Sequence, residues 1–329
     1  MELNSEIKKA TDKIYKKISK TMPEIEWAIH APYIYKINKL KKEKNAVILA
    51  HNYQTPEIYH GISDFSADSL ALAVEAAKTE SEIIIMCGVH FMAETAKLMS
   101  PEKKVFLPDM KAGCSLSSSI TGKDVRELKN KYPGVPVVSY VNTSADVKAE
   151  TDVCCTSANA VKIVNSLGAK KVIFLPDDYL AKYVASQTDV EIISWKGTCE
   201  VHEQFNDHEI NEIRRNNPGI KIIAHPECPP DVINASDFAG STSGMIKYVK
   251  DNQPEKVMMV TECSMSDNVQ IDNPNVQFIR PCNLCPHMKR ITLPKVLDCL
   301  ENETNEIVMS KEIIEKARKS VERMAEIGR

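Results

Sequence analysis

The chain has 329 residues, of which 43% are hydrophobic and 6% aromatic, and its 42 basic and 45 acidic side chains give a formal net charge of −3. This length accommodates two or three domains, and the small net charge gives no support for a nucleic-acid partner or a membrane-surface role.

The first 20 residues are charged throughout and lack the apolar segment of a signal peptide. Apolar runs elsewhere, such as EIIIMCGV at residues 82–89, are too short to cross a bilayer. We therefore expect a cytoplasmic protein with no membrane contact. In that compartment the ten cysteines indicate metal binding or redox chemistry instead of structural disulfides.

An internal repeat begins after the first 40 residues, which are predicted to form amphipathic helices that pack on the first repeat. Three apolar runs each predict a buried strand that ends in polar residues, namely AVILAHNY (46–53), PVVSYVNT (136–143) and KIIAHPEC (221–228). Two polar side chains lie two positions apart at each carboxyl end, which places both on one side of the strand. The pairs are His51 and Tyr53, Tyr140 and Asn142, and His225 and Glu227.

A polar turn and a helical pattern follow each of these strands. The turns in ADSLALAVEAA, CTSANAVKIV and GSTSGMIKYV place Ser69, Ser157 and Thr242 in matching positions. A hydroxyl at the start of a helix is commonly an N-cap. Three helix amino termini in register can instead form an anion site, and the repetition favours this interpretation.

Each repeat closes with a strand that ends on a cysteine, in KKVFLPDMKAGC, VEIISWKGTC and VQFIRPCNLC. Cys199 follows Cys114 by 85 positions and precedes Cys285 by 86. Cys282 and Cys285 form a C-x-x-C pair that has no second pair nearby, unlike a compact zinc site. The register predicts that the partners of Cys285 are the equivalent cysteines of the two earlier repeats.

Three converging thiolates fit either zinc with a fourth ligand or an iron–sulfur cluster. A cubane held by three cysteines leaves one iron open, and an open metal position is typical of a Lewis-acid catalyst. The alternative for any single cysteine is packing as a small buried hydrophobe. We favour packing for six of them: Cys87, Cys154, Cys155, Cys228, Cys263 and Cys299.

Strands that alternate with helices predict an α/β fold with parallel sheets. We expect three similar α-β-α layered domains around a pseudo-threefold axis, with the active site at the centre. The predicted domains are residues 1–117, 118–203 and 204–294. Residues 295–329 are expected to form helices that pack back on the first domain.

Several motifs occur together in a fixed order. They are AHNYQ-x-PE, DSL, CGVHFMAETAKLMSPEKKVFLPDMKAGCSL, YVNTSADVKAE, CTSANA, HPEC, GSTSGM and NLCPHMK. Over residues 40–325 this series resembles the quinolinate synthase family, the A-type enzymes of de novo NAD biosynthesis. Each motif alone is weak evidence, but their joint order is specific.

The resemblance implies an enzyme that condenses iminoaspartate with dihydroxyacetone phosphate to quinolinate, releasing phosphate and two waters. It implies a [4Fe–4S] cluster on Cys114, Cys199 and Cys285, whose fourth iron acts as a Lewis acid. An aspartate-oxidising enzyme is the expected source of iminoaspartate. The implied substrate contacts are His51, Tyr53, Ser69, Tyr140, Asn142, Ser157, His225, Glu227, Ser241 and Thr242.

Glu227 is the predicted general base, with a pKa raised toward neutrality by burial in a closed pocket. His51, His225, Tyr53 and Tyr140 are the other predicted catalytic groups, as proton donors or relays. His202 is a further candidate for the site.

Cys282 resembles an extra cysteine of some family members that is proposed to form a redox-active disulfide; we do not expect it to be a ligand. Two rival functions are a cluster-dependent hydro-lyase acting on another small acid and a non-catalytic zinc protein that senses a small anion.

Overall fold

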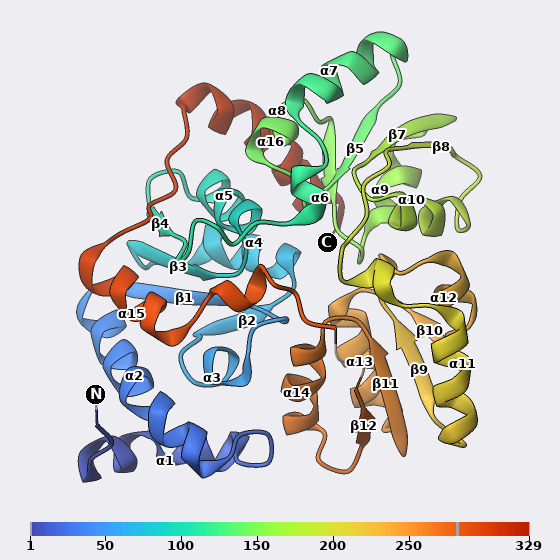
Figure 1. Ribbon diagram of the computed structural model, residues 1–329. Helices are drawn as coiled ribbons and strands as arrows, with labels where there is room; N and C mark the ends of the chain where they lie inside the picture. Colours follow the sequence, from blue (N-terminus) through green and yellow to red (C-terminus); the bar gives the residue numbers. More distant parts are fainter. Residues whose placement is uncertain (1, 281–282, 329) are drawn as a thin grey trace. The chain divides into compact units, whose positions relative to one another are not determined.

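The computed structural model describes residues 2–280 and 283–328. It divides into two compact units. Unit 1 comprises Met1–Ala112, Cys263–Asn275 and Leu284–Ile307, and unit 2 comprises Gly113–Glu262, Val276–Asn283 and Val308–Arg329. The secondary-structure elements are labelled in Figure 1.

The fold is α/β, with three four-stranded parallel sheets of identical strand order, as the repeat predicted. In each sheet the second strand of the repeat lies at one edge, followed by the first, third and fourth. The strands are β1 (Ala46–His51), β2 (Phe65–Ala67), β3 (Ile83–Cys87) and β4 (Lys104–Phe106); β5 (Val137–Tyr140), β6 (Val153–Cys155), β7 (Lys171–Leu175) and β8 (Glu191–Ser194); and β9 (Lys221–Ala224), β10 (Phe238–Ala239), β11 (Lys256–Val260) and β12 (Gln277–Ile279).

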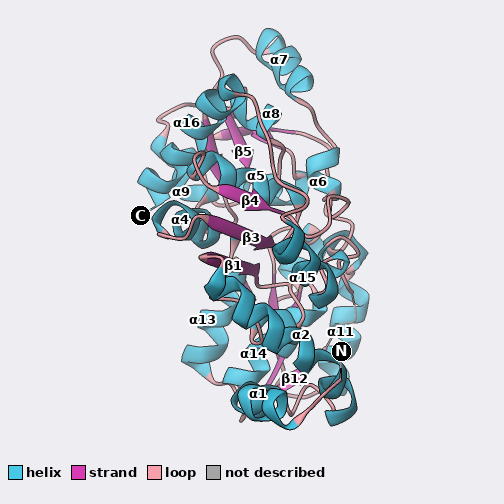
Figure 2. Ribbon diagram, turned by 90° about the vertical axis from the view of Figure 1, so that its left-hand side faces the viewer, coloured by secondary structure: helices cyan, strands magenta, loops and turns pink. Residues whose placement is uncertain are grey.

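The sheet of unit 1 has a nearly continuous apolar centre because helices cover it. All five residues of β3 are buried, as are five of the six in β1, which is typical of a parallel sheet covered on both faces. Figure 2 shows β1, β3 and β4 running side by side in one direction. The helices of this unit are α1 (Ser5–Ile18), α2 (Glu24–Glu43), α3 (Pro56–Tyr59), α4 (Ser69–Lys78), α5 (His90–Met99), α14 (Cys263–Asp272) and α15 (Leu293–Asn302).

Unit 2 contains the other two sheets, each with its own apolar core. Val125, Val137, Ile173 and Leu175 are fully buried in the second repeat, and Ile222, Val232 and Val260 in the third. The α-helices of this unit are α6 (Ser115–Ser118), α7 (Gly122–Lys131), α8 (Ala145–Ala149), α9 (Ala160–Ser166), α10 (Asp178–Ala185), α11 (Asp207–Asn216), α12 (Pro230–Asn234), α13 (Thr242–Asn252) and α16 (Lys311–Gly328).

The two carboxyl-terminal helices do not share one partner, which corrects the expectation for residues 295–329. Helix α15 packs on α2 and β3 in the first repeat, as expected, whereas α16 packs on α8, β6 and α9 in the second. The buried side of α16 carries Ala317, Ser320, Val321 and Met324. The Ser320 hydroxyl donates to the Lys148 carbonyl at 3.0 Å. An amphipathic pattern predicts that a helix packs, but it does not identify the sheet.

The domain boundaries at residues 117, 203 and 294 and the pseudo-threefold arrangement stay predictions. Within residues 2–280 and 283–328, no helix combines the length and apolar character that a bilayer crossing requires.

His60 makes unit 1 sensitive to acid. Burial is the largest effect on its pKa, with a smaller contribution from the Lys17 charge, and together they lower the pKa to about 4. The folded state thus binds this proton less readily than the unfolded chain. The contribution of neutral His60 to the free energy of unfolding is complete above the unfolded pKa of about 6.5. It is lost as the pH falls toward 4, which lowers the free energy of unfolding by up to roughly 3 kcal/mol.

We expect His60→Phe to reduce the loss of stability between pH 7 and pH 4.5, as measured by urea unfolding at several pH values. The control is the same substitution at the exposed histidine of α11, His208→Phe, which shows the effect of replacing a surface histidine. An unaltered pH profile in His60→Phe would contradict the assignment.

Candidate active site

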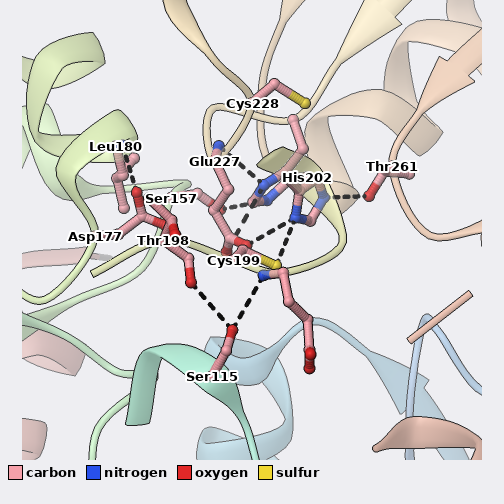
Figure 3. A network of polar contacts seen from close by, with 12 residues as sticks. Ser115, Ser157, Asp177, Leu180, Thr198, Cys199, His202, Glu227, Cys228 and Thr261 are labelled. Atoms are coloured by element: carbon pink, nitrogen blue, oxygen red, sulfur yellow. Dashed lines mark hydrogen bonds and ion pairs between the residues drawn. The ribbon is translucent and has the colours of Figure 1, made fainter. Parts of the chain in front are cut away.

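The predicted polar residues of the second and third repeats meet in unit 2. Tyr140 ends β5, and its hydroxyl donates to Oε1 of Glu227 at 2.5 Å. Ser157 Oγ lies 3.1 Å from Nε2 of His225, so a second contact joins the same two repeats. Figure 3 shows the polar network around Glu227, with Cys199, His202 and Ser157 nearby.

At most one member of each predicted pair lies on its strand. His51 and Tyr140 are the last residues of β1 and β5, while His225 follows the end of β9. The second members, Tyr53 and Glu227 among them, lie in the turns beyond. The strands are therefore shorter than predicted, because these turns fold back on the strand ends.

His51 and His225 occupy equivalent positions and have the same backbone contact. Nδ1 of His51 accepts the N–H of Tyr53 at 3.2 Å, and Nδ1 of His225 accepts the N–H of Glu227 at 3.4 Å. In both rings this leaves Nε2 to carry the proton of the neutral imidazole. The repeat thus fixes the orientation of both histidines, and in His225 it directs Nε2 at Ser157.

His202 is fully within the site, although it was only a candidate from the sequence. The side chain is buried, with Nδ1 3.0 Å from Cys199 Sγ and 3.0 Å from Glu227 Oε2. Its Nε2 lies 3.0 Å from the Thr261 hydroxyl, and its ring stacks on that of His225. No motif identified Thr261, which directly follows β11.

The expectation that the pKa of Glu227 is raised is wrong. Burial does raise it, but the His225 and His202 imidazoles and the hydrogen bonds from His202 and Tyr140 outweigh burial and hold the pKa well below its usual range. The sequence showed a carboxylate in a pocket but not the donors around it. Glu227 is therefore a carboxylate that accepts hydrogen bonds at neutral pH.

Asp177 is a second buried acid that the sequence analysis missed. Its Oδ1 caps α10 by accepting the N–H of Leu180 at 2.9 Å, and Oδ2 has no hydrogen-bond partner among the described residues. Burial and the nearby charge of Glu227 raise its pKa well above the ordinary value. The site thus combines an ionised carboxylate with an acid that favours its protonated form.

Two of the three predicted cluster cysteines are held close together by one hydroxyl. Ser115, which follows Cys114, donates to the Thr198 carbonyl at 3.1 Å and accepts the N–H of Glu200 at 3.1 Å (Figure 3). These two groups flank Cys199. Burial raises the pKa of the Cys199 thiol well above its ordinary value, and the Glu227 charge and the Cys114 thiol add to this effect. Neither cysteine forms a disulfide within the described part of the chain, so the donor set fits a metal or cluster that binds thiolates.

Ser115 is expected to position these ligands. We predict that Ser115→Ala lowers cluster retention about 10- to 100-fold, since outer contacts that orient metal ligands have effects of this size. The measurement is the rate of iron loss to a chelator under anaerobic conditions. Ser118, exposed on the same short helix, provides the control Ser118→Ala. Equal rates of iron loss in the two variants would exclude a positioning role.

Unit 1 holds the first-repeat residues His51, Tyr53 and Ser69, together with Cys285. Asn268 on α14 donates to the carbonyls of Asn52 and Gln54, at 3.2 and 2.7 Å. Lys289 donates to the Tyr53 carbonyl at 2.8 Å and to the Ser264 hydroxyl at 2.7 Å, while its own N–H bonds to the Cys285 carbonyl. The turn that carries Tyr53 is thereby linked to the segment that carries Cys285.

Ser69, Ser157 and Thr242 are not the N-cap residues of their helices. Ser69 and Thr242 are the first residues of α4 and α13, and the capping side chains are Asp68 and Ser241. Ser157 precedes α9 and contacts His225. Asn142 is half-buried in the turn after β5.

The cysteines expected to pack are mostly buried. Cys87, Cys154, Cys155, Cys228 and Cys299 are buried, whereas Cys263 is only partly buried, as are the three predicted ligands. Cys282, and with it the C-x-x-C disulfide hypothesis, lies outside the described residues.

Repeated parallel-sheet units, together with Cys199, His202 and Glu227 placed close enough to bind a metal ion, define an α/β enzyme with a candidate metal-binding site. The sequence profile of the family described as Quinolinate synthetase A protein matches residues 35–326. This chain belongs to the quinolinate synthase family.

Several curated relatives match almost the whole chain, and each is named quinolinate synthase. The protein of Sinorhizobium fredii is 60% identical over 98% of this chain and 89% of its own length. That of Caulobacter vibrioides is 55% identical over the same shares, and that of Agrobacterium fabrum is 54% identical over 99% and 94%.

Proposed function

We propose that this chain is a quinolinate synthase, which condenses iminoaspartate with dihydroxyacetone phosphate to quinolinate, phosphate and two waters. The observation that carries the proposal is the meeting of Tyr140 with Glu227 and of Ser157 with His225. These residues come from separate repeats of a chain that matches the family over nearly its full length.

Both substrates are anionic, and helix amino termini can bind them without a cluster of lysines. Ser241 caps α13 and Thr242 is the first residue of that helix, and both are buried; Ser69 is the first residue of α4. The first N–H groups of a helix lack partners within the helix and lie at its positive end, so they favour carboxylate or phosphate. We propose Ser69, Ser157, Ser241 and Thr242 as substrate contacts, with His51, Tyr53 and Asn142.

Cys114, Cys199 and Cys285 are the proposed ligands of a [4Fe–4S] cluster. Cys114 and Cys199 are supported by the Ser115 contacts, and Cys285 by the repeat register and the resemblance. When bound, the cluster supplies a Lewis acid at its open iron that favours loss of hydroxide.

The remaining chemistry is proton transfer by side chains. Glu227 is the proposed general base, and its low pKa means that it gains a proton only after substrate displaces one of its donors. Tyr140 then donates to the reacting oxygen instead of to Glu227. His225, whose Nε2 contacts the Ser157 hydroxyl, is the proposed relay to a second substrate atom. His51 and Tyr53 are the proposed counterparts in the first repeat.

Anaerobic purification followed by one assay tests this function. We expect a brown protein containing iron and sulfide that forms quinolinate from iminoaspartate and dihydroxyacetone phosphate. A colourless protein containing zinc would favour a small-anion sensor. A cluster-containing protein that forms no quinolinate but dehydrates another small acid would favour a hydro-lyase. We further propose a cytoplasmic location, with iminoaspartate supplied by an aspartate-oxidising enzyme.

A further inference from the structure

Three potential metal-binding atoms converge in unit 2 without requiring Cys114 or Cys285. Cys199 Sγ, His202 Nδ1 and a Glu227 carboxylate oxygen all lie within 4.8 Å of one another. His202 Nδ1 is 3.0 Å from both of the other two. Thiolate, imidazole and carboxylate are the ligand types that zinc takes in proteins.

The outer atoms of two of these side chains are already held by hydrogen bonds. Thr261 lies 3.0 Å from His202 Nε2, and in the tautomer that donates Nε2–H to Thr261 the lone pair of Nδ1 faces Cys199 and Glu227. Tyr140 donates to Glu227 Oε1 and leaves Oε2 toward His202. Metal-binding histidines and carboxylates are typically oriented in this way by a second layer of contacts.

We propose that the cluster-free chain binds one divalent ion of the zinc class on Cys199, His202 and Glu227. Binding forms one bond each to Sγ, to the lone pair of Nδ1 and to a carboxylate oxygen, and it releases the thiol proton to solvent. The thiolate and the Glu227 carboxylate then balance the two positive charges of the ion.

The two contacts of His202 Nδ1 need only small adjustments to hold such an ion. Ligand bonds of about 2.0–2.3 Å place tetrahedral ligand atoms roughly 3.3–3.6 Å apart, so the present 3.0 Å contacts widen by a few tenths of an ångström. Three protein ligands leave a fourth position for water or a small anion.

This site and the proposed cluster exclude each other because both use Cys199. That consequence rests on the proposed function, whereas the metal site itself does not. A zinc ion bound here would stop cluster assembly while leaving Cys114 and Cys285 free of metal.

Cobalt(II) is the probe for the test, because its thiolate charge-transfer absorption reports the number of sulfur ligands. The full chain, stripped of metal under anaerobic conditions, is titrated with cobalt(II). We expect one ion per chain with one sulfur ligand, confirmed on the zinc form by X-ray absorption. Cys114→Ser and Cys285→Ser should bind cobalt as the wild type does. Three sulfur ligands, or loss of binding in either variant, would overturn the proposal.

His202→Gln is expected to weaken cobalt binding at least about 100-fold, and Thr261→Val roughly 10-fold. Circular dichroism and thermal unfolding show whether each variant is folded. If His202→Gln does not fold, the sulfur count of the wild type still decides the question. Unchanged affinity in a folded His202→Gln would contradict the assignment of this ligand.

Reconstitution with iron and sulfide after one equivalent of zinc tests the exclusion. Zinc should block cluster assembly in the wild type, whereas His202→Gln should resist this block because its three cysteines remain. If no cluster forms even without zinc, the proposed function fails while the metal site is judged by cobalt alone. If a cluster forms but zinc does not compete, only the proposed exclusion fails.

Discussion

Replacing Cys114, Cys199 or Cys285 with alanine, one at a time, is expected to abolish the iron–sulfur cluster and all turnover. A cubane held by only three protein ligands has no spare thiolate, so loss of one leaves two of its irons without a protein ligand. We expect iron and sulfide to fall to background after anaerobic purification, together with the brown colour. A fully loaded and active variant would remove that cysteine from the ligand set.

The other cysteines supply controls for this result. Cys263 is partly buried, like the three predicted ligands, yet it lies outside their register. Cys263→Ala should keep its iron, and so should Cys282→Ala, because Cys282 is not an expected ligand. Loss of the cluster in either control variant would mean that cluster assembly depends on the number of cysteines and not on the repeat register of the three predicted ligands.

Glu227→Gln is expected to retain the cluster but to reduce turnover about 10²- to 10⁴-fold, the usual contribution of a general acid or base. Glutamine keeps the size of the side chain and a hydrogen-bond acceptor for Tyr140, but it carries no charge opposite His202. Iron content and the rate of quinolinate formation are measured on the same preparation. Turnover like that of the wild type would exclude Glu227 as the base.

Glu212→Gln provides a matched control, since Glu212 is exposed on α11 in the same repeat. It should leave iron content and rate unchanged. Thermal unfolding separates a catalytic effect from a structural one, because Glu227→Gln also removes the carboxylate that lies against the buried His202 ring. Tyr140→Phe, which removes one donor to Glu227, should lower the rate by a smaller factor of roughly 10.

The fold class follows from local patterns that a sequence displays directly. A run such as IIIMC predicts a strand buried on both faces, and its recurrence with helical segments predicts parallel sheets. The surface on which α16 packs could not be predicted from such patterns, because its apolar stripe fits any complementary surface. Its position depends on particular contacts, such as that of Ser320 with Lys148.

The repeat, the three cysteines in register and the polar residues at strand ends could all be predicted from the amino-acid sequence alone. The spacing between residues can be read from the sequence directly and does not depend on the three-dimensional structure. Only the tertiary structure brought His202, Thr261 and Asp177 to the site and reversed the expected pKa shift of Glu227. A pKa depends on which donors and charges lie within a few ångströms, and folding sets those distances between residues far apart in the chain.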